Sequence, residues 1–283
     1  AEAQRTNVAG AAAALAQIIR AGHRLVITHG NGPQIGLLAL QGAAYKPDEA
    51  FPLDVLGAET DGMIGYMIEQ ALENALGHDR AVATLLTQIE VDPKDPAFAK
   101  PTKFIGPVYD KAEAERLAQA RGWSIAADGA HWRRVVPSPM PSGIPDLKVL
   151  ELLLEQDVTL ICAGGGGIPV VRRADGSLIG VEAVIDKDHA TALLAHKLKA
   201  DALLLLTDVE AVFRGFGTEA QTAIRRVSPE DAVRLDLPEG SMAPKVAAAA
   251  SFVSGRDRYA CVGRLEDALA MLEGRAGTMI ANT

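Results

Sequence analysis

Residues 25–36 read Leu25-Val26-Ile27-Thr28-His29-Gly30-Asn31-Gly32-Pro33-Gln34-Ile35-Gly36. The apolar start predicts a strand, and the apolar run that follows the turn predicts a helix. Glycines at a strand-to-helix turn let a small anion approach the backbone, whose N–H groups at the helix start attract negative charge. The spacing matches neither the Rossmann nor the P-loop pattern. The alternative is a tight turn that binds no ligand.

Composition narrows the class of protein. The chain has 283 residues, of which 48% are hydrophobic and 23% charged, as in a globular α/β protein of one large or two smaller domains. A net charge of −8 argues against general nucleic-acid binding but leaves room for a local basic pocket. No apolar run reaches the ~20 residues of a membrane span.

Cysteine usage indicates a reducing compartment. The two cysteines, Cys162 and Cys261, lie in apolar strand-like runs and are expected to be small buried thiols. We find no spacing typical of a metal site or a disulfide framework. A cytoplasmic protein without membrane or nucleic-acid partners fits these observations.

Helical and strand patterns alternate along most of the chain. This alternation predicts an α/β fold, a three-layer αβα sandwich with a mainly parallel central sheet. Expected helices are 8–20, a helix from 35, 57–76, 111–121, 146–156, 188–198, 229–234, 243–254 and 265–273. Expected strands are 24–27, 81–89, 159–163, 202–207 and 258–262.

Residues 91–141 break the alternation. This stretch is rich in proline and contains one helical pattern, 111–121. Such a long excursion predicts a small protruding subdomain or lid, inserted into a single domain that spans 1–283. An irregular surface insertion is the alternative.

A second glycine run follows the strand 159–163. Gly164-Gly165-Gly166-Gly167 gives a backbone that can wrap around an anion. Because the carboxyl ends of parallel strands meet at one edge of a sheet, both glycine turns are expected to face the same site. A flexible turn is the other interpretation.

Three lysines could serve such a site. Lys187 stands between Asp186 and Asp188 at a predicted helix start, where a capping aspartate beside a solvated lysine is the simpler reading. Lys245 falls in the first turn of a helix, where its charge opposes the helix dipole and suggests an anion nearby. Lys103 lies in a proline-bounded loop and by itself resembles an ordinary surface lysine.

The apolar strand 202–207 ends in Thr207-Asp208, followed by Val209 and Phe213, which could line an adenine slot; a capped loop is the alternative. His29 has no paired ligand at helical spacing and is expected to anchor backbone or face substrate. Lysines and glycine turns without a Ser-His-Asp set suit phosphoryl transfer, which depends on positioning and charge neutralisation. Mg²⁺ is expected with the nucleotide, without a dedicated protein cage.

The glycine turn resembles, nearly residue for residue, the Thr-His-Gly-Asn-Gly-Pro-Gln-[Val/Ile]-Gly signature of carbamate kinases, members of the amino acid kinase superfamily. Further stretches match in family order over essentially the whole chain. They are 52–58, 62–66, 91–93, 97–98, 101–103, 106–107, 132–139, 164–169, 180–188, 206–209, 240–242 and 244–245.

The resemblance implies a homodimer that transfers a phosphoryl group reversibly between ATP and carbamate, giving ADP and carbamoyl phosphate. The family often runs toward ATP in arginine catabolism. By motif, Lys103, Lys187 and Lys245 would neutralise charge and Asp188 would organise these lysines. The substrate-binding residues implied are Gly30, Asn31, Gly32, Gly165 and Gly166. The nucleotide-binding residues implied are Thr207, Asp208, Val209, Phe213 and Met242.

The chain departs from the family pattern in two places. The family's opening strand, which ends in Gly-Gly-Asn-Ala, is not found in this sequence. We expect that the protein has this strand and that the sequence as given leaves it out. Ala243 stands where the family commonly has glycine. Two alternatives stay open: a non-catalytic sensor of carbamoyl phosphate or nucleotide with the same fold, and a superfamily kinase with another acceptor.

Overall fold

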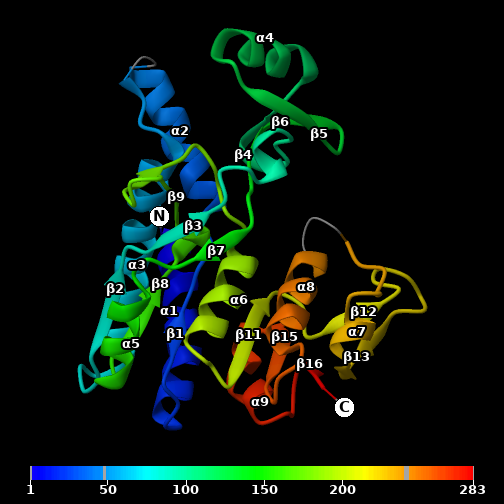
Figure 1. Ribbon diagram of the computed structural model, residues 1–283. Helices are drawn as coiled ribbons and strands as arrows, with labels where there is room; N and C mark the ends of the chain where they lie inside the picture. Colours follow the sequence, from blue (N-terminus) through cyan, green and yellow to red (C-terminus); the bar gives the residue numbers. More distant parts are fainter. Residues whose placement is uncertain (1, 47–48, 239–241, 283) are drawn as a thin grey trace.

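The computed structural model describes residues 2–46, 49–238 and 242–282. Helices and strands alternate through the body, and a small subdomain projects from it beside α2 (Figure 1). The helices are α1 (Glu2–Arg20), α2 (Gly32–Tyr45), α3 (Leu53–Leu76), α4 (Lys111–Arg121), α5 (Leu147–Glu155), α6 (Lys187–Lys197), α7 (Pro229–Ala232), α8 (Met242–Val253) and α9 (Ala268–Leu272).

The strands form several hydrogen-bonded groups. They are β1 (Val26–Ile27), β2 (Val82–Leu85), β3 (Gln88–Val91), β4 (Lys103–Tyr109), β5 (Ser124–Asp128), β6 (His131–Val136), β7 (Pro141–Gly143), β8 (Thr159–Cys162), β9 (Ile168–Arg172), β10 (Leu178–Gly180), β11 (Ala202–Thr207), β12 (Val212–Arg214), β13 (Thr222–Ile224), β14 (Arg226–Val227), β15 (Tyr259–Arg264) and β16 (Thr278–Ala281).

Strand β8 is the centre of the parallel sheet β1-β8-β2. Its side chains alternate between two cores, as the two-residue period of a strand requires. Ile161 packs with α1 and α3, whereas Leu160 and Cys162 pack with α5 and α6. Helices therefore cover both faces of this sheet, which confirms the predicted α/β sandwich.

The C-terminal half is built on β11-β15-β16-β14. Strands β11 and β15 are parallel, while β15 and β16 are antiparallel. Helix α8 packs on this sheet through an alanine-rich face that includes Ala248, Ala249 and the fully buried Phe252. Small side chains allow the helix to approach the sheet closely.

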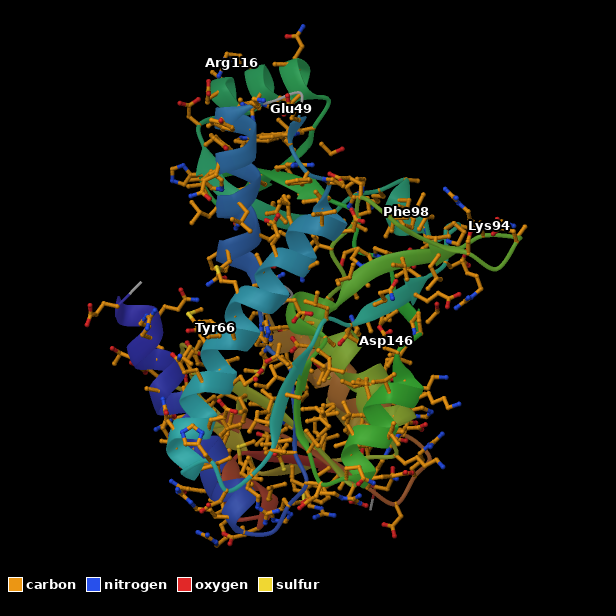
Figure 2. All side chains as sticks on the ribbon, turned by 90° about the vertical axis from the view of Figure 1, so that its left-hand side faces the viewer. Glu49, Tyr66, Lys94, Phe98, Arg116 and Asp146 are labelled. Atoms are coloured by element: carbon orange, nitrogen blue, oxygen red, sulfur yellow. The ribbon has the colours of Figure 1, made fainter. Side chains whose placement is uncertain are left out.

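The subdomain consists of the antiparallel sheet β4-β6-β5 and helix α4 (Figure 1). The chain leaves the body after Val91 and returns at Pro141, and these two residues are register partners in the β3–β7 pair. In Figure 2 the labelled Arg116, on α4, lies at the far end of the projection. A proline-rich segment can leave and re-enter the body at one point because an antiparallel pair closes its base.

Several predicted boundaries differ from the structure. The predicted strand 81–89 is two strands, β2 and β3, which belong to different sheets. The helix predicted over 57–76 begins at Leu53, after Pro52, and the helix predicted from 8 begins at Glu2. Gly77 and Gly122 end their helices in the left-handed conformation that glycine adopts without strain. The strands of the subdomain and the hairpins β9–β10 and β12–β13 were not predicted, because their short runs lack a clear period.

A cavity of about 740 Å³ lies between β1 and β11. Its walls are mainly apolar and include Leu15 and Ile18 of α1 and Leu194 of α6. Among the described residues, β1 pairs with β8 alone and β11 pairs with β15 alone. The facing edge strands β1 and β11 of two sheets thus line one slot, whose lining includes Gly30 and Asp188.

Ile161 tests the two-faced core. Its side chain is fully buried, so Ile161→Ala should lower the free energy of unfolding by about 2–5 kcal/mol, measured by urea titration. Val149→Ala, at a side chain that is 49% exposed, is the control and should change it by less than about 0.5 kcal/mol. Equal effects of the two substitutions would contradict the assignment of β8 as the central strand.

Candidate active site

The turn between β1 and α2 is held open toward solvent by a side chain that does not cap its own helix. Asn31 stands at the N-cap of α2 without a side-chain capping bond. Its Nδ2 instead donates to Thr60 Oγ1 of α3 at 2.9 Å, and the residue is 5% exposed. Helix α3 therefore fixes the turn, and the N-terminus of α2 is left available for an anion.

The second glycine loop interlocks with this turn. Gly165 has a φ of 67° and donates its N–H to the His29 carbonyl at 2.7 Å. A Cβ on Gly165 would overlap the Asn31 amide, and one on Gly166 would overlap the Ile185 carbonyl. The structure thus brings both predicted glycine turns to one edge of the sheet, and only glycine fits at their contact.

A buried carboxylate lies beneath the two turns. Asp61 of α3 is fully buried, and its Oδ1 accepts the Gly164 N–H at 3.0 Å. His29 Nε2 is 3.4 Å from the same oxygen. His29 therefore anchors the turn, as expected. Its carbonyl accepts the Gly165 N–H, and its ring lies next to the Asp61 carboxylate.

The predicted lysines converge from three elements. Asp188 of α6 is 7% exposed and accepts from Lys187 Nζ at 3.0 Å and from Lys245 Nζ at 3.0 and 3.2 Å. Lys103, on β4 of the subdomain, does not join Asp188. Its Nζ is 2.7 Å from Asp186 Oδ2. Asp186 also caps α6, because its Oδ1 accepts the N–H groups of the second and third residues after it.

The lysine cluster touches the first glycine turn. A Cβ on Gly30 would lie 3.4 Å from Lys187 Cε, so the Lys187 side chain packs over this turn. The simpler interpretation was a capping aspartate beside a solvated lysine. Asp186 is indeed the helix cap, but Lys187 packs over the glycine turn and is not simply solvated. The first glycine turn and the lysine cluster therefore adjoin each other.

A cavity of about 1140 Å³ opens beside Lys245. Every residue assigned to nucleotide binding lines it: Thr207, Asp208, Val209, Phe213 and Met242. The Phe213 and Phe216 rings lie 5.9 Å apart in a tilted arrangement on its wall. Gly240 and Ser241, part of the motif that the sequence singled out here, lie outside the described residues.

Comparisons with known proteins agree with this site. A family model described as the amino acid kinase family matches residues 2–263. A carbamate kinase of Rhizobium meliloti (strain 1021) is 54% identical over 100% of this chain and 88% of its own length. One from Haemophilus influenzae is 53% identical over 99% of this chain and 90% of its own. The solved structure of Giardia lamblia carbamate kinase bound to AMP-PNP is 38% identical, with a TM-score of 0.90, covering 99% of this chain and 91% of that one.

The chain belongs to the carbamate kinases, within the amino acid kinase family. It is accordingly a phosphotransferase, and its fold is that of the family.

The charges of this carbamate kinase site leave an excess of positive charge. Lys103, Lys187 and Lys245 carry three positive charges, and Asp186 and Asp188 carry two negative ones. The cluster therefore keeps a net charge of +1, obtained as three minus two. A site of this kind favours an anion such as a phosphoryl group.

Burial and ion pairing shift the pKa values of Lys245 and Lys187 in opposite directions. Burial lowers the pKa of Lys245 below its usual range, and Lys187 lowers it further although Asp188 acts in the opposite direction. Burial also acts on Lys187, but there Asp188 and Asp186 outweigh it and the pKa lies above its usual range. For Asp186, burial raises the pKa, yet the Lys103 ion pair outweighs it and the pKa lies below normal. Of the three lysines, only Lys245 lines the cavity beside it.

Sequence reasoning missed Asp61, Asp186 as the partner of Lys103, and several residues of the nucleotide cavity. Asp61 had a signal: it occupies the buried face of α3, between Leu56 and Ile64, where a helical period places apolar residues. The cavity residues had none, because they come from separate segments: the end of β12 and the loops that follow β12 and α7. They include Arg214, Phe216, Arg234, Leu235 and Leu237.

Lys245→Met tests the lysine cluster. Removing this cation should lower kcat for phosphoryl transfer by about a hundred- to a thousandfold, the usual loss for one group that stabilises transition-state charge. The fold should persist, because Lys245 contacts a carboxylate and not the apolar core, and circular dichroism checks this. Lys245→Arg, which keeps the charge, is the matched control and should retain more activity. Normal turnover by the methionine variant would remove Lys245 from the site.

Proposed function

We propose that this chain catalyses the reversible transfer of a phosphoryl group between ATP and carbamate through the lysine cluster described above. A carbamate oxygen attacks the γ-phosphorus, the bond to the β–γ bridging oxygen breaks, and ADP leaves with that oxygen. The observation that carries the assignment is the net-positive cluster of Lys103, Lys187 and Lys245 between the glycine turns and the cavity. The reaction needs positioning and charge neutralisation, which this arrangement offers.

Each group of residues takes one part of the substrates. The glycine turns hold carbamate and the transferred phosphoryl group through Gly30, Asn31, Gly32, Gly165 and Gly166. Of these, Gly30 and Gly32 are exposed at the sheet edge, whereas Asn31, Gly165 and Gly166 are buried. Lys187 and Lys245 neutralise charge between donor and acceptor, and Asp188 holds the two lysines together by accepting from both. Thr207, Asp208, Val209, Phe213 and Met242 shape the nucleotide pocket, which their shared cavity supports.

Mg²⁺ fits this site as a companion of the nucleotide. Among the described residues there is no group of three or more His, Cys, Asp or Glu side chains that could hold a metal ion. Asp186 and Asp188 are already paired with lysines. The nucleotide phosphates and water would therefore supply most of the coordination, and the ion would add charge neutralisation at the β- and γ-phosphates.

We also propose that the chain acts as a homodimer in the cytoplasm, within arginine catabolism and toward ATP, as the family resemblance implies. Met63 and Tyr66 on α3 are 40% and 56% exposed, and Leu86, 54% exposed, lies next to Gly62 of the same helix. Figure 2 labels Tyr66 on this face. These side chains are candidates for the subunit contact.

In the part of the chain that the structure describes, no helix has both the length and the apolar character to cross a membrane.

Conversion of carbamoyl phosphate tests the reaction. With ADP and Mg²⁺, the protein should form ATP from carbamoyl phosphate but not from acetyl phosphate at equal concentration, followed by a coupled assay. Lys245→Met is the inactive control. Folded protein that binds nucleotide but makes no ATP would favour the sensor or another acceptor.

The slot between β1 and β11 supports a further part of this proposal. Both of its edges are parallel strands that lack a described partner on that side, and its lining includes Gly30 and Asp188. We propose that an opening strand of the family type fits here, which would bring its Gly-Gly-Asn-Ala end to the phosphoryl group.

A fusion tests the slot. Joining such a strand ahead of residue 2 should raise both the melting temperature and the rate of ATP formation relative to the 283-residue chain. Filling an apolar cavity and pairing two open edges both stabilise the fold. A fusion of the same composition in scrambled order is the control. An equal gain with the scrambled segment would exclude the slot as the site of this strand.

A further inference from the structure

The protruding subdomain contacts the body through helix α2 and through one short extended segment, residues 182–186. Successive side chains of this segment face opposite ways. Ala183 and Ile185 are 1% exposed, and Ile185 belongs to the main apolar core with β8 and α6. Glu182, Val184 and Asp186 each contact the subdomain or the residues that follow it. This alternation is that of a strand, although the segment pairs with no neighbour as one.

Val184 makes the apolar part of this contact. It lies in one cluster with Ile105 of β4 and Val136 of β6, two residues at the base of the subdomain. Its N–H donates to the Pro137 carbonyl at 2.9 Å, where the chain leaves β6. The same cluster includes Ile35 of α2, and Gly36 of α2 packs closely against Gly106 of β4, so apolar burial joins the subdomain to the body on this side.

Two carboxylates make the directional part, and each divides its two oxygens in the same way. Asp186 caps α6 with Oδ1 and binds Lys103 of the subdomain with Oδ2 at 2.7 Å. Glu182 accepts the Leu53 N–H at the start of α3 with Oε2 at 2.8 Å and binds Arg134 of β6 with Oε1 at 3.3 Å. Each carboxylate therefore ties one subdomain cation to the N-terminus of one helix of the body.

The two cations differ in their surroundings. Arg134 has a 17% exposed side chain, stacks 4.8 Å from the Trp123 ring centre and belongs to the subdomain sheet. Burial lowers the pKa of Arg134, and Glu182, whose side chain is 53% exposed, partly offsets this. Lys103 instead points to the start of α6, whose next residues are Lys187 and Asp188. One ion pair thus holds the base of the subdomain, and the other holds the lysine that reaches the site.

We propose that Asp186 and Glu182 are positioning residues for phosphoryl transfer, which seat the subdomain so that Lys103 stays beside Lys187 and Lys245. This inference rests on the proposed function of Lys103. Without Asp186, two neighbouring lysines would repel Lys103, and the subdomain would lose its directional contact at the site. Asp186 then holds Lys103 of the subdomain, and Asp188 holds Lys187 and Lys245 of the body.

Asp186→Asn isolates this role from helix capping. Asparagine caps a helix as well as aspartate does, so the melting temperature should change little. Its amide cannot replace the carboxylate as the partner of Lys103, and kcat/KM for carbamoyl phosphate should fall about tenfold, as expected for a misplaced group. Glu182→Gln should lower kcat/KM by less and in the same direction. Asp128→Asn is the matched control, because Asp128 pairs with Arg133 inside the subdomain, and it should leave kcat/KM unchanged.

A double-mutant cycle decides whether Asp186 acts through Lys103. In a Lys103→Met background, Asp186→Asn should cause no further loss of kcat/KM, whereas a merely structural effect would add to that of Lys103→Met. Additive losses, or wild-type kinetics for Asp186→Asn alone, would overturn the proposal.

Chemical labelling tests the contact between Asp186 and Lys103 without a measurement of turnover. An amine-specific reagent followed by mass spectrometry should modify Lys103 several times faster in Asp186→Asn than in the wild-type chain, and at the wild-type rate in Asp128→Asn. Equal rates in Asp186→Asn and wild type would contradict the proposal. If the wild-type chain makes no ATP, the proposed function fails, while the labelling rates still decide whether Asp186 holds Lys103.

Discussion

Asp188 places one buried negative charge between two lysines, and the rest of the site depends on this contact. Lys187 and Lys245 come from different helices and would repel each other at this distance without the carboxylate. Desolvating three charged groups is costly, and the packing of α6 against α8 has to supply the compensation. The result is a fixed pair of cations with one uncompensated charge in the cluster, ready for an anionic substrate.

The layers around this contact explain why it can be so rigid. Strand β8 is buried on both faces, and its carboxyl end leads directly into the glycine loop at Gly164. Helix α3 supports the loop and the β1 turn together, through Asp61 on Gly164 and Thr60 on Asn31. The anion-type turns are therefore attached to the most deeply buried part of the protein. The third lysine is different, since Lys103 comes from the projecting subdomain, which contacts the body through α2 and residues 182–186.

Much of this could be predicted from the sequence. The alternation of apolar strands and helices gave the α/β class, and the proline-rich stretch 91–141 indicated an insertion before any strand in it was visible. Lys187 and Asp188 could be singled out because they adjoin in the chain, and the two glycine turns because each follows an apolar run. Asp61 was missed although a carboxylate on the apolar face of a helix is a recognisable signal. The partner of Lys103 could not be found, since Asp186 is 83 residues away.

The sequence by itself determined the local chemistry of this protein: which turns expose backbone N–H groups, which residues cap helices, and which strands are apolar on both faces. These follow from neighbours within a few residues, where propensity and period act. Only the tertiary structure decided which charges meet. Ion pairs such as Lys245–Asp188 and Lys103–Asp186 join residues 57 and 83 positions apart, and no local pattern distinguishes a paired lysine from a solvated one. Burial and long-range geometry bring three ordinary lysines into one cluster with Asp186 and Asp188.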